Sequence, residues 1–385
     1  LVYSLIPERA IGLNGEELVL GMAGRATGGL AVWMALWWLT EATSIYATAL
    51  LPLAIMPLVQ IGTMGETASA YAHPLIFLFL GGFILALALE KWHLHHRFAL
   101  TVLRCLGTKP TTLVGGFMFV SATLSMWITN TATTLVMLPI LLSVISLLDE
   151  NAPNRKNFSL CLLLGVAYAA SIGGIGTIVG TVPNMFTVSF IQTELGIEIG
   201  FAKWMTIGVP IVLVFVPLAW FLLTRFIYPP GEEAIDRAFL DKNPEPWSRG
   251  AKLTLFIFIL TALSWISRPL ITTWSPLANL TDTGIAIISA LLLFTIPVSF
   301  KQREFLIDWA TAIKIPWGVL LLFGGGLALA GAIRSTGLGE LLASQLVSLR
   351  GIPPLVMTLL VVTLIIFLTE LTSNPATTTA LIPIF

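Results

Sequence analysis

Two polar breaks inside apolar segments hold the residues of this sequence that are best suited to chemistry. Residues 129–140 read TNTATTLVMLPI and residues 373–384 read SNPATTTALIPI, and the two segments share six identical positions. Each has an asparagine at its second position, Asn130 and Asn374, followed by threonines. Asparagine is favoured as a helix N-cap, so each break predicts a helix that begins at that point. The free amides and partial positive charge of such helix ends bind anions, and two together would form a cradle for a carboxylate.

Hard oxygen atoms surround the same breaks. The first break combines Ser125, Thr129 and Asn130 with the carbonyls that we expect to be freed near Gly176, in the segment SIGGIGTIVGTVPN. Such oxygens suit Na⁺ and could not hold a soft metal. The equivalent residues of the second break are Thr369, Ser373 and Asn374.

The charge pattern supports a cation that accompanies an anion. Lysine and arginine are absent from residues 111–154, 158–202 and 351–385. An anion bound between the two breaks would therefore be balanced by helix ends, hydroxyls, amides and co-bound cations. The alternative is that the polar residues of the two breaks only end helices and fill polar space between them. The matched pair of breaks, together with a glycine-rich segment, argues against this alternative.

Other polar residues give weaker signals. His93, His95 and His96 do not form a tight three-ligand face on a helix, so interfacial packing is the favoured interpretation. Cys105 and Cys161 are expected to pack in the core. The SIGGIG run follows no strand, so it does not indicate a dinucleotide site. Three acids in or near apolar segments are candidates for function or for structural hydrogen bonding: Glu41, Glu90 and Glu370.

The elements that must position these residues are apolar helices. The sequence of 385 residues is 56% hydrophobic and 10% charged, against roughly a quarter charged in soluble domains. This composition predicts an all-α polytopic membrane protein, in the cell (inner) membrane and in contact with the lipid bilayer. A formal net charge of zero gives no indication of nucleic acid. Helices are expected near 27–44, 45–61, 74–92, 94–107, 201–228, 251–266, 280–298, 316–336 and 337–350.

The matched breaks predict an internal duplication. Four glycines and a proline in 171–184 cannot make a stable helix, so the segment is expected to be unwound. Lysine and arginine flank the first break more heavily than the second, which indicates an inverted arrangement. The first copy runs on well past its break, and we expect the second to do the same beyond residue 385. The predicted organisation has three parts. The first repeat, at 1–230, contains scaffold helices, a hairpin at 110–149 and an unwound helix at 157–194. A polar linker at 231–250 leads to the second repeat at 251–385, which is C-terminally incomplete and has a hairpin from 352.

Three stretches resemble one family closely. SMWITNTATTLVMLP at 125–139, SIGGIGTIVGTVPN at 171–184 and LTELTSNPATTTALIPI at 368–384 are similar to the divalent-anion/sodium symporter family, the INDY-type carriers of dicarboxylates, citrate or sulfate. The resemblance covers essentially the whole chain. It implies two re-entrant hairpins, unwound mid-membrane helices, a homodimer and a transport domain that moves as an elevator.

The resemblance also implies residue roles. One sodium site would use Ser125, Thr129, Asn130 and Gly176, and a second would use Thr369 and Asn374. Substrate would contact Asn130, Thr131, Thr177, Ser373, Asn374 and the position of Pro375. Thr129 stands where the family usually has serine and keeps a hydroxyl. Pro375 stands where many bacterial dicarboxylate carriers have threonine, which removes a hydroxyl and an amide donor and puts the identity of the anion in doubt.

The function expected from these observations is sodium-coupled symport of C4-dicarboxylates such as succinate, fumarate or malate, with Na⁺ as the co-transported ion. The alternatives are a sodium-independent di- or tricarboxylate exchanger and a sulfate or citrate carrier of the same fold. An anion channel would need a continuous pore, and paired hairpins that stop at mid-membrane depth argue against one. An enzyme is not expected, because no nucleophile with a base is evident at the same depth.

Overall fold

The computed structural model describes residues 6–11, 17–104, 108–148, 153–231, 246–345 and 351–382. The chain divides into two compact units. The central unit comprises Leu78–Met185 and Ile199–Ile315, and the terminal unit comprises Leu1–Phe77, Phe186–Glu198 and Pro316–Phe385. Each unit therefore draws on both halves of the sequence. The division into two repeats stays a prediction.

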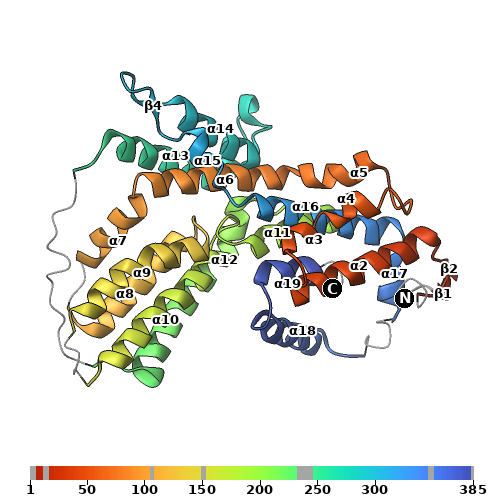
Figure 1. Ribbon diagram of the computed structural model, residues 1–385, viewed down its shortest axis with the longest axis horizontal. Coiled ribbons are helices and arrows are strands. Elements are labelled where there is room, and N and C mark those ends of the chain that lie inside the picture. The colour runs from red at the N-terminus through yellow and green to blue at the C-terminus, as the bar shows by residue number, and fades with distance from the viewer. Residues whose placement is uncertain are drawn as a thin grey trace. The chain divides into compact units, whose positions relative to one another are not determined.

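The regular elements among the described residues of the central unit are helices and one small antiparallel pair of strands (Figure 1). It holds most of α6 (Pro74–Lys91), α7 (Leu94–Arg104), α8 (Pro110–Ser125), α9 (Asn130–Ser146), α10 (Arg155–Gly174), the start of α11 (Val182–Leu195), α12 (Phe201–Leu222) with the π-helical η2 (Leu223–Ile227), α13 (Arg249–Ile271), η4 (Ser275–Leu277), α14 (Asp282–Thr295), β3 (Pro297–Ser299), β4 (Glu304–Phe305) and α15 (Trp309–Ala312).

The terminal unit holds the second predicted hairpin. Its elements are β1 (Arg9–Ile11), β2 (Glu17–Val19), α2 (Met22–Thr40), α3 (Ile45–Thr48), α4 (Leu51–Ile55), α5 (Met64–Ser69), η1 (Ala70–Ala72), the start of α6, most of α11, α16 (Trp317–Ser335), α17 (Leu338–Gln345), α18 (Pro354–Thr369) and α19 (Asn374–Leu381).

The helix expected at 45–61 is interrupted and ends early, at Ile55. The structure has the short helices α3 and α4 there, followed by turns. Pro52 stands in the first turn of α4, where its missing N–H is tolerated but where it cannot continue a preceding helix. Gln60 adopts a positive φ of 58°, which also ends helical geometry. The apolar composition of the segment predicted one continuous helix and did not indicate the interruptions at Pro52 and Gln60.

The core of the central unit lies between α8, α9, α10 and α12. Figure 1 shows α8, α9 and α10 side by side. Their facing side chains are buried, and they include Val114, Phe117, Met118, Met137, Leu141, Phe158, Leu162 and Val166. The packed helices hold the turn between α8 and α9 against the end of α10, where the candidate site lies.

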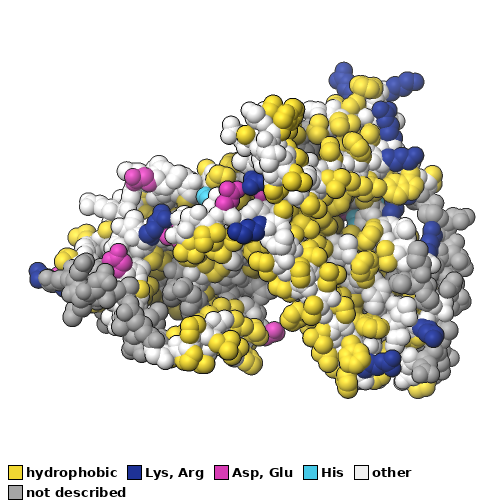
Figure 2. All heavy atoms as spheres, turned by 180° about the vertical axis from the view of Figure 1, so that it is seen from behind, with side chains coloured by type: hydrophobic (Ala, Val, Ile, Leu, Met, Phe, Trp, Pro, Cys, Tyr) yellow, Lys and Arg dark blue, Asp and Glu magenta, His cyan; other side chains and the backbone are white. Residues whose placement is uncertain are grey.

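Several helices are suited to a membrane by length and composition. Five described stretches are long and apolar enough to cross one: Met64–Lys91, Arg155–Gly174, Phe201–Ile227, Arg249–Ile271 and Trp317–Ser335. Figure 2 shows hydrophobic side chains over broad areas of one face. Exposed large hydrophobic residues on α12 include Ile207, Leu213, Val214, Phe215 and Phe221. Water would penalise such a surface, so these helices face lipid or protein.

The hairpin helices are shorter than a crossing requires. α8 has 16 residues and α9 has 17, whereas a bilayer core needs about 20 residues of helix. In the other hairpin α18 has 16 residues and α19 has 8 among those described. Pairs of short helices joined by a polar turn are the geometry of a re-entrant hairpin.

Candidate functional site

The turn between α8 and α9 forms the tip of the first hairpin. α8 ends at Ser125 and α9 begins at Asn130. The N-cap is Thr129, whose hydroxyl accepts from the amide of Ala132 at 3.4 Å. The prediction that Asn130 caps this helix is therefore wrong by one residue, because Thr129 supplies the capping oxygen and leaves the Asn130 side chain for another contact.

Ser125 and Asn130 form a polar pair across this turn. The Ser125 hydroxyl donates to the Asn130 amide oxygen at 2.7 Å. Ser125 is fully buried, with no exposed surface, and Asn130 is half-buried. Two of the predicted sodium ligands are thus in direct contact, and the third, Thr129, lies in the same turn.

The glycine-rich segment is unwound, as predicted. α10 ends at Gly174 and α11 begins at Val182, with no helix between them. A Cβ on Gly174 would lie 2.5 Å from the Asn130 amide oxygen. A Cβ on Gly180 would lie 2.4 Å from the Gly174 carbonyl oxygen and 2.9 Å from the Ser125 carbonyl oxygen. Glycine is therefore needed at both positions, because it lets these oxygens gather beside the hairpin tip.

Asn184 holds the unwound segment and was missed by sequence reasoning. Its side-chain nitrogen donates to the carbonyls of Gly174 and Thr177, at 2.8 Å each. The side chain is 7% exposed, so these bonds satisfy carbonyls that water reaches poorly. The only signal in the sequence is an amide side chain four residues after Gly180, and this does not indicate which carbonyls it reaches.

The remaining predicted residues of the first hairpin have different surroundings. Thr177 is fully buried, and its hydroxyl donates to the Met126 carbonyl in a short hydrogen bond. Gly176 lies against the same residue, because a Cβ there would meet the Met126 side chain at 2.9 Å. Thr131 is exposed in the first turn of α9. Thr177 thus ties the unwound segment to the hairpin, while Thr131 is open to a ligand.

The second hairpin, in the terminal unit, is assembled differently. Ser373 is the N-cap of α19 without a side-chain cap bond, and Pro375 stands in the first turn. Asn374 is the first helical residue rather than the predicted cap, and it is exposed. The Thr369 hydroxyl donates back to the Ile366 carbonyl at 2.9 Å within α18. The contact across this turn instead joins the hydroxyls of Thr372 and Thr377, at 2.5 Å.

The two hairpins therefore differ at matched positions. Thr369 and Asn374 correspond to Ser125 and Asn130, yet among the described residues no hydrogen bond joins Thr369 to Asn374. Among the described residues the first pair is hydrogen-bonded across its turn and the second pair is not, and the assignment of either set to sodium stays a prediction.

The acidic side chains differ between the two tips. Within the described part of the chain, no three His, Cys, Asp or Glu residues gather to hold a metal ion. Glu41, Glu90 and Glu370 are all exposed, and Glu370 is the C-cap of α18, in the turn of the second hairpin. The polar groups described at the first hairpin tip are hydroxyls, an amide and backbone carbonyls.

Short paired helices that meet in polar turns, beside an unwound glycine segment and among apolar spans, define a multi-pass membrane transporter. The model of the citrate transporter family (CitMHS) matches residues 35–385. The chain belongs to this family, and the predicted membership of the divalent-anion/sodium symporters is confirmed. It is a transporter and not an enzyme.

Two named relatives and one solved structure add detail. The chain is 40% identical over 370 residues to the sodium-dependent dicarboxylate transporter SdcS of Staphylococcus saprophyticus subsp. saprophyticus, covering 92% of this chain and 71% of the relative. The SdcS of Staphylococcus aureus (strain USA300) gives the same identity and coverage. The crystal structure of the Alcanivorax borkumensis YdaH transporter, described as having an unusual topology, matches 100% of this chain and 78% of its own with a TM-score of 0.58. Its 16% sequence identity supports the fold alone.

Proposed function

We propose that this protein is a sodium-coupled symporter that imports C4-dicarboxylates, such as succinate, fumarate or malate, by an elevator mechanism. The two SdcS relatives are named as sodium-dependent dicarboxylate transporters, and their 40% identity supports the same class of cargo here. The proposal includes a homodimer, which light scattering on the purified protein would test.

The oxygen cluster at the first hairpin tip carries the proposal of sodium coupling. The Ser125 hydroxyl and the Asn130 amide oxygen are 2.7 Å apart, and the carbonyls of Ser125 and Gly174 face Gly180 beside them. These are uncharged hard oxygens, which suit Na⁺ among the common cations. In this proposal Ser125, Thr129 and Asn130 ligate one sodium ion, with a carbonyl of the segment that includes Gly176. Thr369 and Asn374 contribute to a second sodium ion.

The proposed contacts with the anion are residues at helix N-termini. Asn130 and Thr131 stand at the start of α9, and Ser373, Asn374 and Pro375 stand at the start of α19. Backbone amides in the first turn of a helix are donors that suit carboxylate oxygens. Thr177 would support the anion contacts of the first hairpin, because its hydroxyl holds the unwound segment against the hairpin tip.

Coupling to sodium also follows from the membrane potential. Moving a dianion into a cell against about 100 mV costs roughly 4.6 kcal/mol, at ~2.3 kcal/mol for each charge. Two co-transported Na⁺ ions make the movement electrically neutral, and a third makes it favourable. A carrier without lysine or arginine in its hairpins needs such cations to bind a dianion.

Uptake into proteoliposomes tests this function. Labelled succinate uptake would be followed with an inward Na⁺ gradient or an equal K⁺ gradient, in empty and in succinate-loaded vesicles. We expect uptake into empty vesicles with Na⁺ only. Uptake into loaded vesicles alone, indifferent to Na⁺, would make the protein an exchanger. Competition by citrate or sulfate that exceeds competition by fumarate or malate would overturn the choice of substrate.

A further inference from the structure

One face of α12 lies behind the unwound segment of the first hairpin site. Phe201, Trp204 and Gly208 are spaced three and four residues apart, so they share that face. The indole N–H of Trp204 donates to the Ile175 carbonyl at 2.9 Å. A Cβ on Gly208 would lie 2.5 Å from the same carbonyl oxygen and 3.1 Å from the Gly176 carbonyl oxygen. The helix therefore touches the backbone between Gly174 and Gly176 directly.

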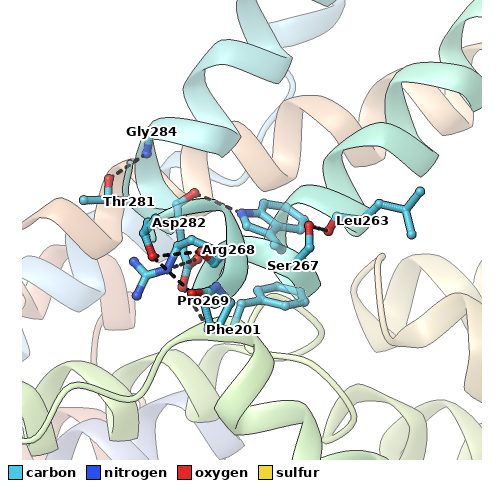
Figure 3. A network of polar contacts seen from close by, with 10 residues as sticks. Phe201, Leu263, Ser267, Arg268, Pro269, Thr281, Asp282 and Gly284 are labelled. Atoms are coloured by element: carbon cyan, nitrogen blue, oxygen red, sulfur yellow. Dashed lines mark hydrogen bonds and ion pairs between the residues drawn. The ribbon is translucent and has the colours of Figure 1, made fainter. Parts of the chain in front are cut away.

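The start of α12 is itself anchored. Figure 3 shows Asp282, the first residue of α14, beside Phe201 and Arg268. The Asp282 carboxylate accepts from the Phe201 amide at 2.8 Å and pairs with Arg268 at 3.2 Å. Asp282 is 7% exposed, so this anchor is shielded from water and from salt.

Aromatic stacking extends the anchor to the hairpin tip. The Phe201 ring stacks on Trp265 with centroids 4.5 Å apart, and Trp127 stacks on Phe201 at 6.0 Å. Trp127 lies in the turn between α8 and α9. The first turns of α12 thus contact both parts of the site, the hairpin tip through Phe201 and the unwound segment through Trp204.

We propose that Trp204 is a positioning residue for sodium binding, which fixes the Ile175 carbonyl and thereby the peptides on either side of it. The inference rests on the proposed sodium site at Ser125 and Asn130. A carbonyl in an unwound membrane segment needs a donor, and the Trp indole can only donate. Without this donor the Ile175 peptide can rotate, which would displace the neighbouring Gly174 carbonyl from the oxygen cluster.

The chain offers a matched control on the same helix. Trp220 donates its indole N–H to the Thr111 carbonyl, also at 2.9 Å. Thr111 lies at the start of α8, about 20 Å along that helix from the hairpin tip. Trp204→Phe and Trp220→Phe each remove one indole hydrogen bond and keep a ring, and only the first of these bonds lies at the site.

Sodium dependence of succinate uptake by the purified protein in proteoliposomes provides the test. We expect Trp204→Phe to raise the sodium concentration for half-maximal uptake about fivefold, as the loss of one net hydrogen bond implies. The succinate KM at saturating sodium should stay unchanged. Trp220→Phe should leave the sodium requirement within about twofold of the wild type, the change expected for a site without direct contact.

A second variant makes the test independent of the indole. Gly208→Ala pushes on the same carbonyls from the same face and should also raise the sodium requirement. Equal sodium requirements in Trp204→Phe, Trp220→Phe and wild type would overturn the positioning role. An equal rise in both tryptophan variants would overturn it too, since that indicates general destabilisation. Sodium-independent uptake by the wild type would instead refute the proposed function.

Discussion

Ser125 and Asn130 are joined by a hydrogen bond of 2.7 Å that connects the last residue of α8 to the first residue of α9. The amide oxygen of Asn130 is the acceptor in this bond, so the bond does not use the two N–H donors of that amide. The Ser125 hydroxyl oxygen keeps its lone pairs for a cation. This contact places Ser125, a proposed cation ligand, next to the Asn130 amide, a proposed anion donor.

A double-mutant cycle tests this pair. We expect Ser125→Ala and Asn130→Ala each to raise the sodium concentration for half-maximal uptake, and the double variant to add little beyond the larger single effect. The coupling energy should be about 1 kcal/mol, as for one net hydrogen bond. The measurement is sodium-dependent succinate uptake at matched protein levels. Fully additive effects would contradict the pairing.

Gly180 is expected to tolerate no side chain. In Gly180→Ala the new methyl group would meet the Gly174 carbonyl at 2.4 Å and the Ser125 carbonyl at 2.9 Å. Both carbonyls are backbone atoms that cannot rotate aside, so uptake should fall by at least about tenfold, a loss of ~1.4 kcal/mol.

Gly331→Ala is the matched control for Gly180→Ala, because a Cβ there has nothing within 4 Å. It lies inside α16 and should keep full uptake, while helix propensity favours alanine by up to about 1 kcal/mol. Loss of uptake in both variants would argue against a specific role for the glycine beside the hairpin tip.

Pro375→Thr is predicted to alter anion preference. The substitution adds a hydroxyl and a backbone N–H to the first turn of α19, at the helix end proposed to meet the carboxylate. We expect the succinate KM to change by about threefold or more, the value of one hydrogen bond, with the sodium requirement unchanged. Inhibition by citrate, fumarate and sulfate would be compared in parallel. An unchanged order of inhibition would place this residue outside the anion site.

Acid should destabilise the protein through His95. Burial, together with the neighbouring charges of His93 and His96, lowers the pKa of His95 from 6.5 to about 4. Between these values the unfolded chain binds a proton that the folded protein does not, so stability is complete above pH 6.5 and falls as the pH drops towards 4. The full effect is of the order of 3 kcal/mol.

Thermal unfolding of the detergent-solubilised protein at pH 7.5 and pH 5 measures this effect. His95→Gln should show a smaller loss at the lower pH than the wild type. His96→Gln removes one of the neighbouring charges that lower the pKa of His95, so it should reduce the acid-induced loss by less than His95→Gln does. An equal acid-induced loss in His95→Gln and wild type would assign the pH dependence to other groups.

The sequence predicted most helices because composition and breaks are local properties. The glycines of 171–184 exclude a stable helix wherever they lie, and the structure unwinds between Gly174 and Val182. The interruption at 45–61 was missed because Pro52 is compatible with the first turn of a helix and gave no clear stop. Asn184 was missed because its role depends on which carbonyls lie within reach, and that is a tertiary property.

The family, the apolar spans and the two polar breaks could be predicted from the amino-acid order, since each depends on residue types in local order. Which oxygens meet is a property of the folded chain. The tertiary structure paired Ser125 with Asn130 and left the matched Thr369 bonded within its own helix. It also set α12 behind the unwound segment through Trp204, a contact between residues 29 apart in the chain. Such contacts depend on how α8, α10 and α12 pack, and no local pattern encodes that packing.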